Sequence, residues 1–147
     1  MLHLEQDVPV DPRFPLSGPE LMEIFEGLAG VFGLGEWELS LRIVDDREMV
    51  ELNGSFMGCL GPTNVLSFPG GEEGWLGDLV LSVETLAREA HIYNQDPWEY
   101  TVRLLAHGLL HLMGHDHGPA MDELTELAVA SVLQDPETSV RRLFPSI

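Results

Sequence analysis

Apolar residues recur along the chain with two different periods, and each period predicts one kind of element. A spacing of three and four residues, which aligns side chains on one helix face, predicts five helices at about residues 17–32, 46–52, 82–94, 96–111 and 119–132. Alternation of apolar and polar residues over 37–43 predicts a half-buried strand. The continuously apolar stretch 76–82 predicts a central strand, 64–68 a further strand, and residues 2–4 a short edge strand.

The order of these elements predicts an α+β (mixed α/β) fold, in which a small mixed β-sheet of about four strands packs with five or six helices, most of them on one face. Between Leu52 and Pro69 the chain is uncharged, and its glycines with Pro62 predict a loop before the strand at 64–68. Because no repeat, low-complexity tract or long linker interrupts the chain, residues 1–147 are expected to form a single domain. The residues of the last helix expected to face the core are Met121, Leu124, Leu127, Ala128 and Val132.

Charge and cysteine content narrow the classes of partner. The chain has 25 acidic residues against 7 basic ones, all of them arginine, and a net charge of -18. This balance argues against tight, nonspecific nucleic-acid binding, and we expect no DNA partner. No apolar run approaches the roughly 20 residues that cross a bilayer, so no membrane association is expected. Cys59 is the single cysteine and the N-terminus lacks a secretory pattern, which together predict a cytoplasmic protein.

Histidines are concentrated in one short stretch, since four of the six lie between His107 and His117. On a helix, His107 and His111 lie one turn apart on the same face. Gly114 can adopt positive φ, end the helix and return His117 toward the first two imidazoles. Three neutral imidazoles with an open coordination position are typical of a catalytic zinc site. An unbroken helix would instead align His115 with His107 and His111, and Gly114 argues against it.

This spacing matches the long motif of metzincin peptidases, H-E-x-x-H-x-x-G-x-x-H, at its histidines and its glycine. The second position, where a peptidase keeps its glutamate general base, is Gly108. Glycine cannot accept a proton from a zinc-activated water. A zincin-like helix is therefore expected without the peptidase chemistry, and a zincin-like metallopeptidase remains an alternative that lacks its base.

The complete motif resembles the signature of the YbeY family, bacterial zinc-dependent endoribonucleases of ribosomal RNA maturation. Segments that resemble other recurring parts of the family precede it in the same order, and the resemblance covers about Leu41 to Glu126. It implies one Zn²⁺ per chain, cleavage of single-stranded RNA during 16S rRNA maturation and ribosome quality control, and ribosome-associated partners. It also implies His107, His111 and His117 as zinc ligands, with His115 at a position that is more usually tyrosine. The residues that carry the resemblance are His107, Gly108, Leu110, His111, Leu112, Gly114, Asp116 and His117, with Asn53, Gly58, 62–69 and 76–79 upstream.

The chain departs from the family where an arginine typically precedes the glycine that is Gly58 here, because Met57 stands in its place. Methionine offers neither charge nor hydrogen-bond donors to a phosphate. Arg103, four residues before His107, is a candidate substitute, and its alternative interpretation is an ordinary surface arginine. A non-catalytic, ribosome-associated zinc protein is therefore a further alternative.

Four polar residues near the motif or in the neighbouring strands also have candidate roles. Asp116 is a candidate to orient an imidazole or accept a proton, with turn capping as the alternative. Asp78 is a candidate partner of a ligand, and Asn64 and Ser67 are candidates to line a cleft. For all four we favour the structural interpretation.

Overall fold

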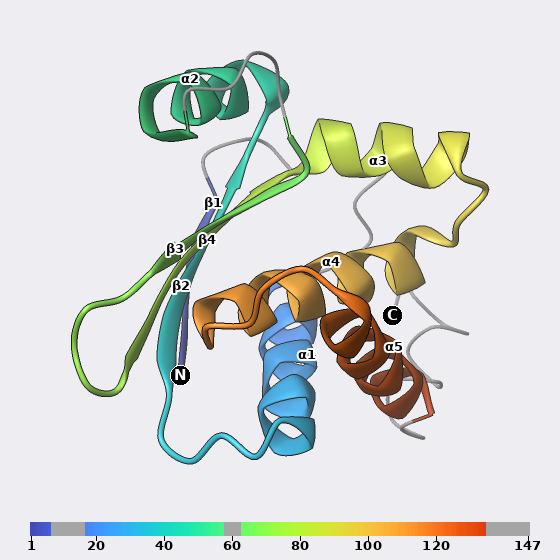
Figure 1. Ribbon diagram of the computed structural model, residues 1–147. Coiled ribbons are helices and arrows are strands. Elements are labelled where there is room, and N and C mark those ends of the chain that lie inside the picture. Colours follow the sequence, from blue (N-terminus) through green and yellow to red (C-terminus); the bar gives the residue numbers. More distant parts are fainter. Residues whose placement is uncertain (7–16, 58–62, 135–147) are drawn as a thin grey trace.

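The computed structural model describes residues 1–6, 17–57 and 63–134, without the Met57 side chain. They form a four-stranded sheet and five helices, as expected for a mixed α+β fold (Figure 1). The elements are β1 (Leu2–Gln6), α1 (Gly18–Val31), β2 (Glu38–Val44), α2 (Asp46–Met57), β3 (Val65–Pro69), β4 (Trp75–Ser82), α3 (Val83–Ile92), α4 (Pro97–Leu112) and α5 (Pro119–Leu133). None of the described helices is both long and apolar enough to cross a membrane.

The sheet has the order β1-β2-β4-β3. Strands β1, β2 and β4 run parallel, whereas β3 pairs antiparallel with β4 at one edge. The main core joins β2 and β4 to α1, α3, α4 and α5 on one face, and α2 covers a small cluster on the other. Alternate side chains of β4 separate these faces, since Leu79 and Leu81 belong to the main core and Val80 to the cluster under α2.

Helix α1 begins where its sequence predicts. The Ser17 hydroxyl accepts from the Glu20 backbone N–H at 3.4 Å, and the Glu20 carboxylate accepts from the Ser17 N–H at 3.1 Å. This capping box satisfies two donors that the first helical turn leaves without partners. The helix ends at Val31, and Gly33 with φ +69° turns the chain away toward β2.

Two expectations about helices were wrong. Helix α2 continues to Met57, although a loop was expected after Leu52. Asn53 is buried in it, so packing overrides the weak helix propensity of the Asn53-Gly54 pair. On α5, Leu127 is 64% exposed rather than in the core. Leu127 follows Met121 by six residues, about 240° around the helix at about 100° per residue. The buried face of α5 is formed by Met121, Thr125, Ala128, Val129 and Val132.

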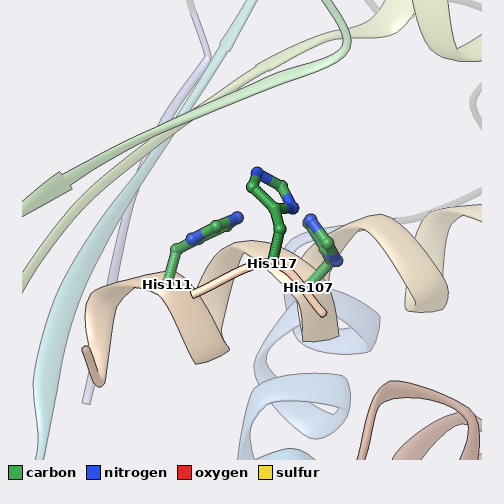
Figure 2. A group of neighbouring side chains, drawn as sticks. All are labelled: His107, His111 and His117. Atoms are coloured by element: carbon green, nitrogen blue, oxygen red, sulfur yellow. The ribbon is translucent and has the colours of Figure 1, made fainter. Parts of the chain in front are cut away.

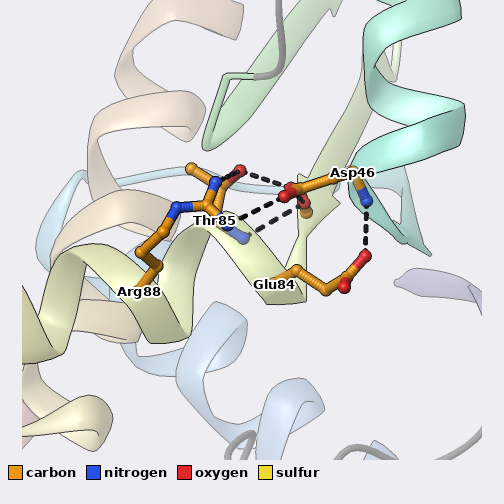
Figure 3. Close-up of polar contacts among 5 residues, drawn as sticks. Asp46, Glu84, Thr85 and Arg88 are labelled. Carbon is orange, nitrogen blue, oxygen red and sulfur yellow. Dashed lines mark hydrogen bonds and ion pairs between the residues drawn. The ribbon is translucent and has the colours of Figure 1, made fainter.

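The start of α2 is joined to the start of α3 through Asp46 (Figure 3). Its carboxylate accepts from Thr85, from Ser82 at 2.7 Å and from Arg88 at 2.9 Å, while its backbone N–H donates to Glu84 at 2.9 Å. Partial burial raises the pKa of the Asp46 carboxyl, but the hydrogen bonds from Thr85, Ser82 and Arg88 outweigh burial and leave this pKa below its ordinary value. Asp46 thus fastens two helix N-termini to the end of β4.

We expect Asp46→Ala to lower the free energy of unfolding by about 1–3 kcal/mol near neutral pH, because several hydrogen bonds to a charged acceptor are lost. A carboxyl whose pKa is lower in the folded state stabilises the protein above its unfolded pKa of about 3.9, and this contribution disappears as the pH falls through the folded pKa. Urea unfolding at several pH values should therefore show the difference between wild type and Asp46→Ala shrinking below about pH 4.

The control is Glu51→Ala, which removes the same charge from an exposed position of α2. It should change the free energy of unfolding by no more than about 0.5 kcal/mol. A difference between wild type and Asp46→Ala that stays constant down to the acid-unfolding range would contradict a role for the charged carboxylate.

Candidate metal centre

Helix α4 carries the first two histidines of the motif. Its start is capped by Asp96, whose side chain accepts from the Glu99 N–H at 3.0 Å, and Pro97 occupies the first turn. The middle of the helix is buried against the sheet and the other helices. His107 and His111 lie at the edge of this buried stripe and remain half-buried. They therefore face a cleft beside β3 instead of the core.

Gly108 allows α4 to approach β3 closely. A Cβ atom at this position would lie 3.0 Å from Leu79 Cδ2 and 3.4 Å from Val65 Cγ2. The Ser67 hydroxyl donates to the Gly108 carbonyl at 3.2 Å, which ties the helix to the strand. A glutamate at position 108 would require the side chains of Leu79 and Val65 to shift. The residue that stands where a peptidase has its glutamate base is thus a packing contact between α4 and the sheet.

A turn at Gly114 reverses the chain after α4. Gly114 has φ +95°, a conformation that favours glycine, and the His115 N–H donates back to the Leu110 carbonyl at 3.0 Å. The following residues return over the end of α4 before α5 begins at Pro119. This path places His117 opposite the two helical histidines (Figure 2).

The three imidazoles converge. The ring centroids lie 4.8 Å apart for His107 and His111, 5.3 Å for His107 and His117, and 4.5 Å for His111 and His117. One nitrogen from each ring lies within 4.8 Å of the others. Zinc holds imidazole nitrogens at about 2.0–2.1 Å, so three such nitrogens around one ion lie roughly 3–4 Å apart. The donor set and its spacing fit a single metal ion, and His115 is not among these converging nitrogens.

The local electrostatics favour the neutral imidazoles that a metal requires. Burial, followed by the charges of His111 and His117, lowers the pKa of His107. Burial, followed by the charge of His117, also lowers the pKa of His111. A hydrogen bond to the His115 backbone opposes that shift and orients the His111 ring.

A cleft of about 590 Å³ opens beside the three imidazoles. One wall is β3 and the residues before it, and the other is the end of α4 with the turn after it. Asn64 and Ser67 lie in this lining, and both side chains are engaged: Asn64 donates to Glu89 at 3.0 Å and Ser67 to the Gly108 carbonyl. The lining residues are Thr63, Asn64, Val65, Leu66, Ser67, Pro69, His107, His111, Gly114, His115, Asp116 and His117.

Two residues that hold the cleft wall were missed from the sequence. The carboxylate of Glu89 accepts from Asn64 and from the Tyr100 hydroxyl, the latter at 2.9 Å. Burial and the neighbouring Glu89 raise the pKa of Tyr100, so its hydroxyl keeps the proton that it donates. Glu89 lies 25 residues from Asn64, and no local pattern of residues points to this contact.

The acidic candidates differ in position. Asp116 lines the cleft, and its charge raises the pKa of His111 without reversing the effect of burial. Asp78 lies on β4 outside the cleft lining and accepts a hydrogen bond from Ser40 on β2. Asp78 thus has the structural role that its sequence interpretation favoured, whereas Asp116 lies where chemistry is feasible.

The structure does not bring Arg103 to the cleft, contrary to its candidate role there. Its guanidinium donates to Glu126 of α5 at 2.8 and 2.9 Å and to Glu99 at 3.3 Å. Hydrogen bonding to Glu126 raises the pKa of Arg103 and lowers that of Glu126. Arg103 and His107 lie on the same stripe of α4, but the long Arg103 side chain extends toward the carboxylates of Glu99 and Glu126 and not toward the cleft.

We expect Arg103→Ala to leave RNA cleavage and metal content unchanged and to lower the free energy of unfolding by about 1 kcal/mol, because its ion pairs are partly exposed. The control Arg47→Ala removes the same charge at an exposed position of α2 and should alter the unfolding free energy less. Loss of cleavage by a folded, metal-loaded Arg103→Ala protein would restore the catalytic role.

A mixed sheet, a helix with histidines one turn apart and a third histidine returned by a glycine turn together define a three-histidine site able to bind a metal. Residues 20–131 match the model of the family described as Endoribonuclease YbeY. The chain belongs to this family, in agreement with the resemblance of its motif.

Individual relatives and a solved structure agree with this assignment. The chain is 37% identical over 137 residues to an Endoribonuclease YbeY of Oleidesulfovibrio alaskensis, covering 77% of this chain and 81% of the relative. It is 37% identical over 142 residues to an Endoribonuclease YbeY of Nitratidesulfovibrio vulgaris, covering 82% and 88%. A solution structure from Thermotoga maritima matches with a TM-score of 0.68 at 25% identity, over 95% of this chain and 93% of the other. The arrangement in Figure 1 is therefore shared with a solved protein.

Proposed function

We propose that this chain is a zinc-dependent endoribonuclease that cleaves single-stranded RNA in 16S rRNA maturation and ribosome quality control. The observation that carries the proposal is the convergence of three imidazoles in an open cleft, in a member of the YbeY family. His107, His111 and His117 are the proposed ligands of one Zn²⁺. Ribosomes or ribosome-associated proteins are the proposed partners, and the cytoplasm is the proposed compartment.

In the proposed cleavage of a phosphodiester, different residues of the cleft have different roles. The three imidazoles hold the ion, which when bound supplies Lewis acidity for activating water and stabilising charge on a phosphate oxygen. The β3 wall confines the RNA strand beside them. Asp116 is exposed in the cleft, where its carboxylate is the proposed acceptor for a proton from the attacking group, either a water or the 2′-hydroxyl of the RNA.

Recruitment by a protein partner fits the charge distribution. Three of the described arginines are engaged by carboxylates, since Arg42 pairs with Glu48, Arg88 with Asp46 and Arg103 with Glu126. None of the three lines the cleft. With a net charge of -18, weak intrinsic affinity for RNA phosphates is the expected result. Tight binding of naked RNA that is unaffected by ribosomal partners would contradict this part of the proposal.

The decisive experiment pairs metal analysis of the purified protein with cleavage of a 16S rRNA precursor and of an unstructured protein. The proposal predicts one zinc per chain, cleavage of the single-stranded RNA that chelation abolishes and zinc restores, and no proteolysis. Zinc-dependent proteolysis without RNA cleavage would establish the metallopeptidase, although Gly108 stands where its base would be and an added Cβ there would lie 3.0 Å from Leu79.

The non-catalytic alternative rests on Met57 and on the lack of arginine in the described cleft lining. The variant Met57→Arg restores the residue type that the family typically has, and it separates the two possibilities. Cleavage by the wild type, with or without an increase in Met57→Arg, supports the nuclease. A zinc-loaded protein that never cleaves the precursor, even as Met57→Arg, would establish the non-catalytic role.

A further inference from the structure

The polar side chains of the cleft differ in whether they are already engaged. The Asn64 amide donates to Glu89 at 3.0 Å, and its oxygen accepts from the Val65 N–H at 2.6 Å. The Ser67 hydroxyl donates to the Gly108 carbonyl at 3.2 Å. These groups hold the wall of the cleft. Once the three converging imidazoles are set aside for the metal, the residues with polar side chains that remain in the described lining are Thr63, His115 and Asp116.

Of these three, His115 alone offers a nitrogen donor. An imidazole has an N–H donor even when it is neutral, whereas an ionised aspartate only accepts hydrogen bonds and repels a phosphate. Thr63 offers a single hydroxyl. No lysine or arginine lies in the described lining, so His115 is the strongest donor for an anion there apart from the proposed metal ligands.

The backbone holds His115 in place at the cleft. Its N–H donates to the Leu110 carbonyl at 3.0 Å, and its backbone also bonds the His111 imidazole. His115 is half-buried, and within the described part of the chain its ring makes no hydrogen bond. A ring carried on a fixed backbone and still available for bonding loses little conformational freedom when it binds a ligand.

We propose that His115 is a substrate-binding residue, whose ring N–H donates a hydrogen bond to a phosphate oxygen of the RNA strand in the cleft. This inference rests on the proposed nuclease function. It requires only the donor of the neutral ring, and His115 stays outside the converging set of three nitrogens. Because the described lining of the cleft contains no arginine, this donor orients the phosphate relative to the three imidazoles.

Two variants separate hydrogen bonding from ring stacking. His115→Phe keeps an aromatic ring and loses both nitrogens, whereas His115→Gln loses the ring and keeps an N–H donor. On the zinc-loaded protein, we expect His115→Phe to raise KM for single-stranded RNA about tenfold, the loss typical of a hydrogen bond to a charged acceptor. We expect kcat and zinc content to change by less than about twofold, and His115→Gln to recover most of the affinity.

The control is His91→Phe, the same substitution at an exposed histidine of α3 outside the cleft lining, which should match wild type. An unchanged KM in His115→Phe would overturn the proposal. An equal increase in KM for His115→Phe and His115→Gln would also overturn it, because an N–H donor would then not restore binding. Loss of zinc in either variant would also overturn it by making His115 a ligand.

A binding measurement keeps this inference separate from the nuclease proposal. Dissociation constants for a single-stranded 2′-O-methyl RNA report phosphate binding even if the wild type cleaves no RNA. A roughly tenfold weaker binding to His115→Phe, with recovery in His115→Gln, supports His115 in that case as well. Equal binding by wild type and His115→Phe would overturn it, whatever the cleavage assay shows.

Discussion

Alanine at position 111 is expected to remove the metal and with it RNA cleavage. His111 lies at the centre of the site, since its ring centroid is 4.8 Å from that of His107 and 4.5 Å from that of His117. Two imidazoles with water ligands hold zinc far less tightly than three. Because changes outside the ligand shell already cost 10–100-fold, we expect a loss in zinc affinity of more than about 100-fold. The readouts are zinc per chain after gel filtration and the rate of RNA cleavage.

The fold should survive this substitution. The His111 ring lies at the cleft and is not part of the main hydrophobic core, and α4 packs against that core through its apolar side. Circular dichroism and urea unfolding of the metal-free wild type and His111→Ala proteins should agree within about 1 kcal/mol. The control is His91→Ala on α3, which should keep both zinc and cleavage. A His111→Ala protein that retains stoichiometric zinc and full cleavage would exclude His111 as a ligand.

Gly77→Ala is expected to be the most destabilising single-methyl change in the described part of the chain. Gly77 has φ +140°, and an added Cβ would lie 2.2 Å from the Phe68 carbonyl oxygen and 2.8 Å from the Gly70 nitrogen. It would also lie 2.9 Å from Leu112 at the end of α4. Two of these neighbours are backbone atoms, so no rotamer change relieves the overlap. We expect the free energy of unfolding to fall by at least about 3 kcal/mol, a large effect that is typical of strained or overpacked sites.

A matched control separates the steric overlap from the strained backbone. Gly74 also has positive φ, at +81°, but an added Cβ there meets nothing within 4 Å. Gly74→Ala should therefore cost only the backbone strain, about 1–2 kcal/mol. Thermal and urea unfolding of both variants measure the difference. Equal destabilisation by the two substitutions would show that the contact of β4 with β3 and α4 adjusts easily.

Features that depend on neighbours within a turn or two were predictable from the sequence. The helix predicted from about residue 17 begins at the capping box of Ser17 and Glu20, and Gly114 bends the chain at the expected residue. The convergence of His107, His111 and His117 follows from the helical period and that single turn. Family membership was also predictable, because the motif and its upstream segments occur in order over most of the chain.

Other features depended on contacts between residues far apart in the chain. Burial of Asn53 extends α2 into the expected loop, and the carboxylate of Glu126 directs Arg103 toward α5 instead of the cleft. Glu89 reaches Asn64 from a different helix and holds one wall of the cleft.

The kinds of elements, the turn at Gly114 and the three histidines that this turn brings together follow from the amino-acid sequence, since hydrogen bonds and side-chain periods within a few residues specify them. Which side chains of the cleft make hydrogen bonds within the protein, as Asn64 and Ser67 do, depends on tertiary contacts. The same contacts leave the His115 ring without such a bond among the described residues. That distinction depends on the packing of α3 and α4 against β3. Packing sums many weak contacts between distant residues, and no local pattern encodes it.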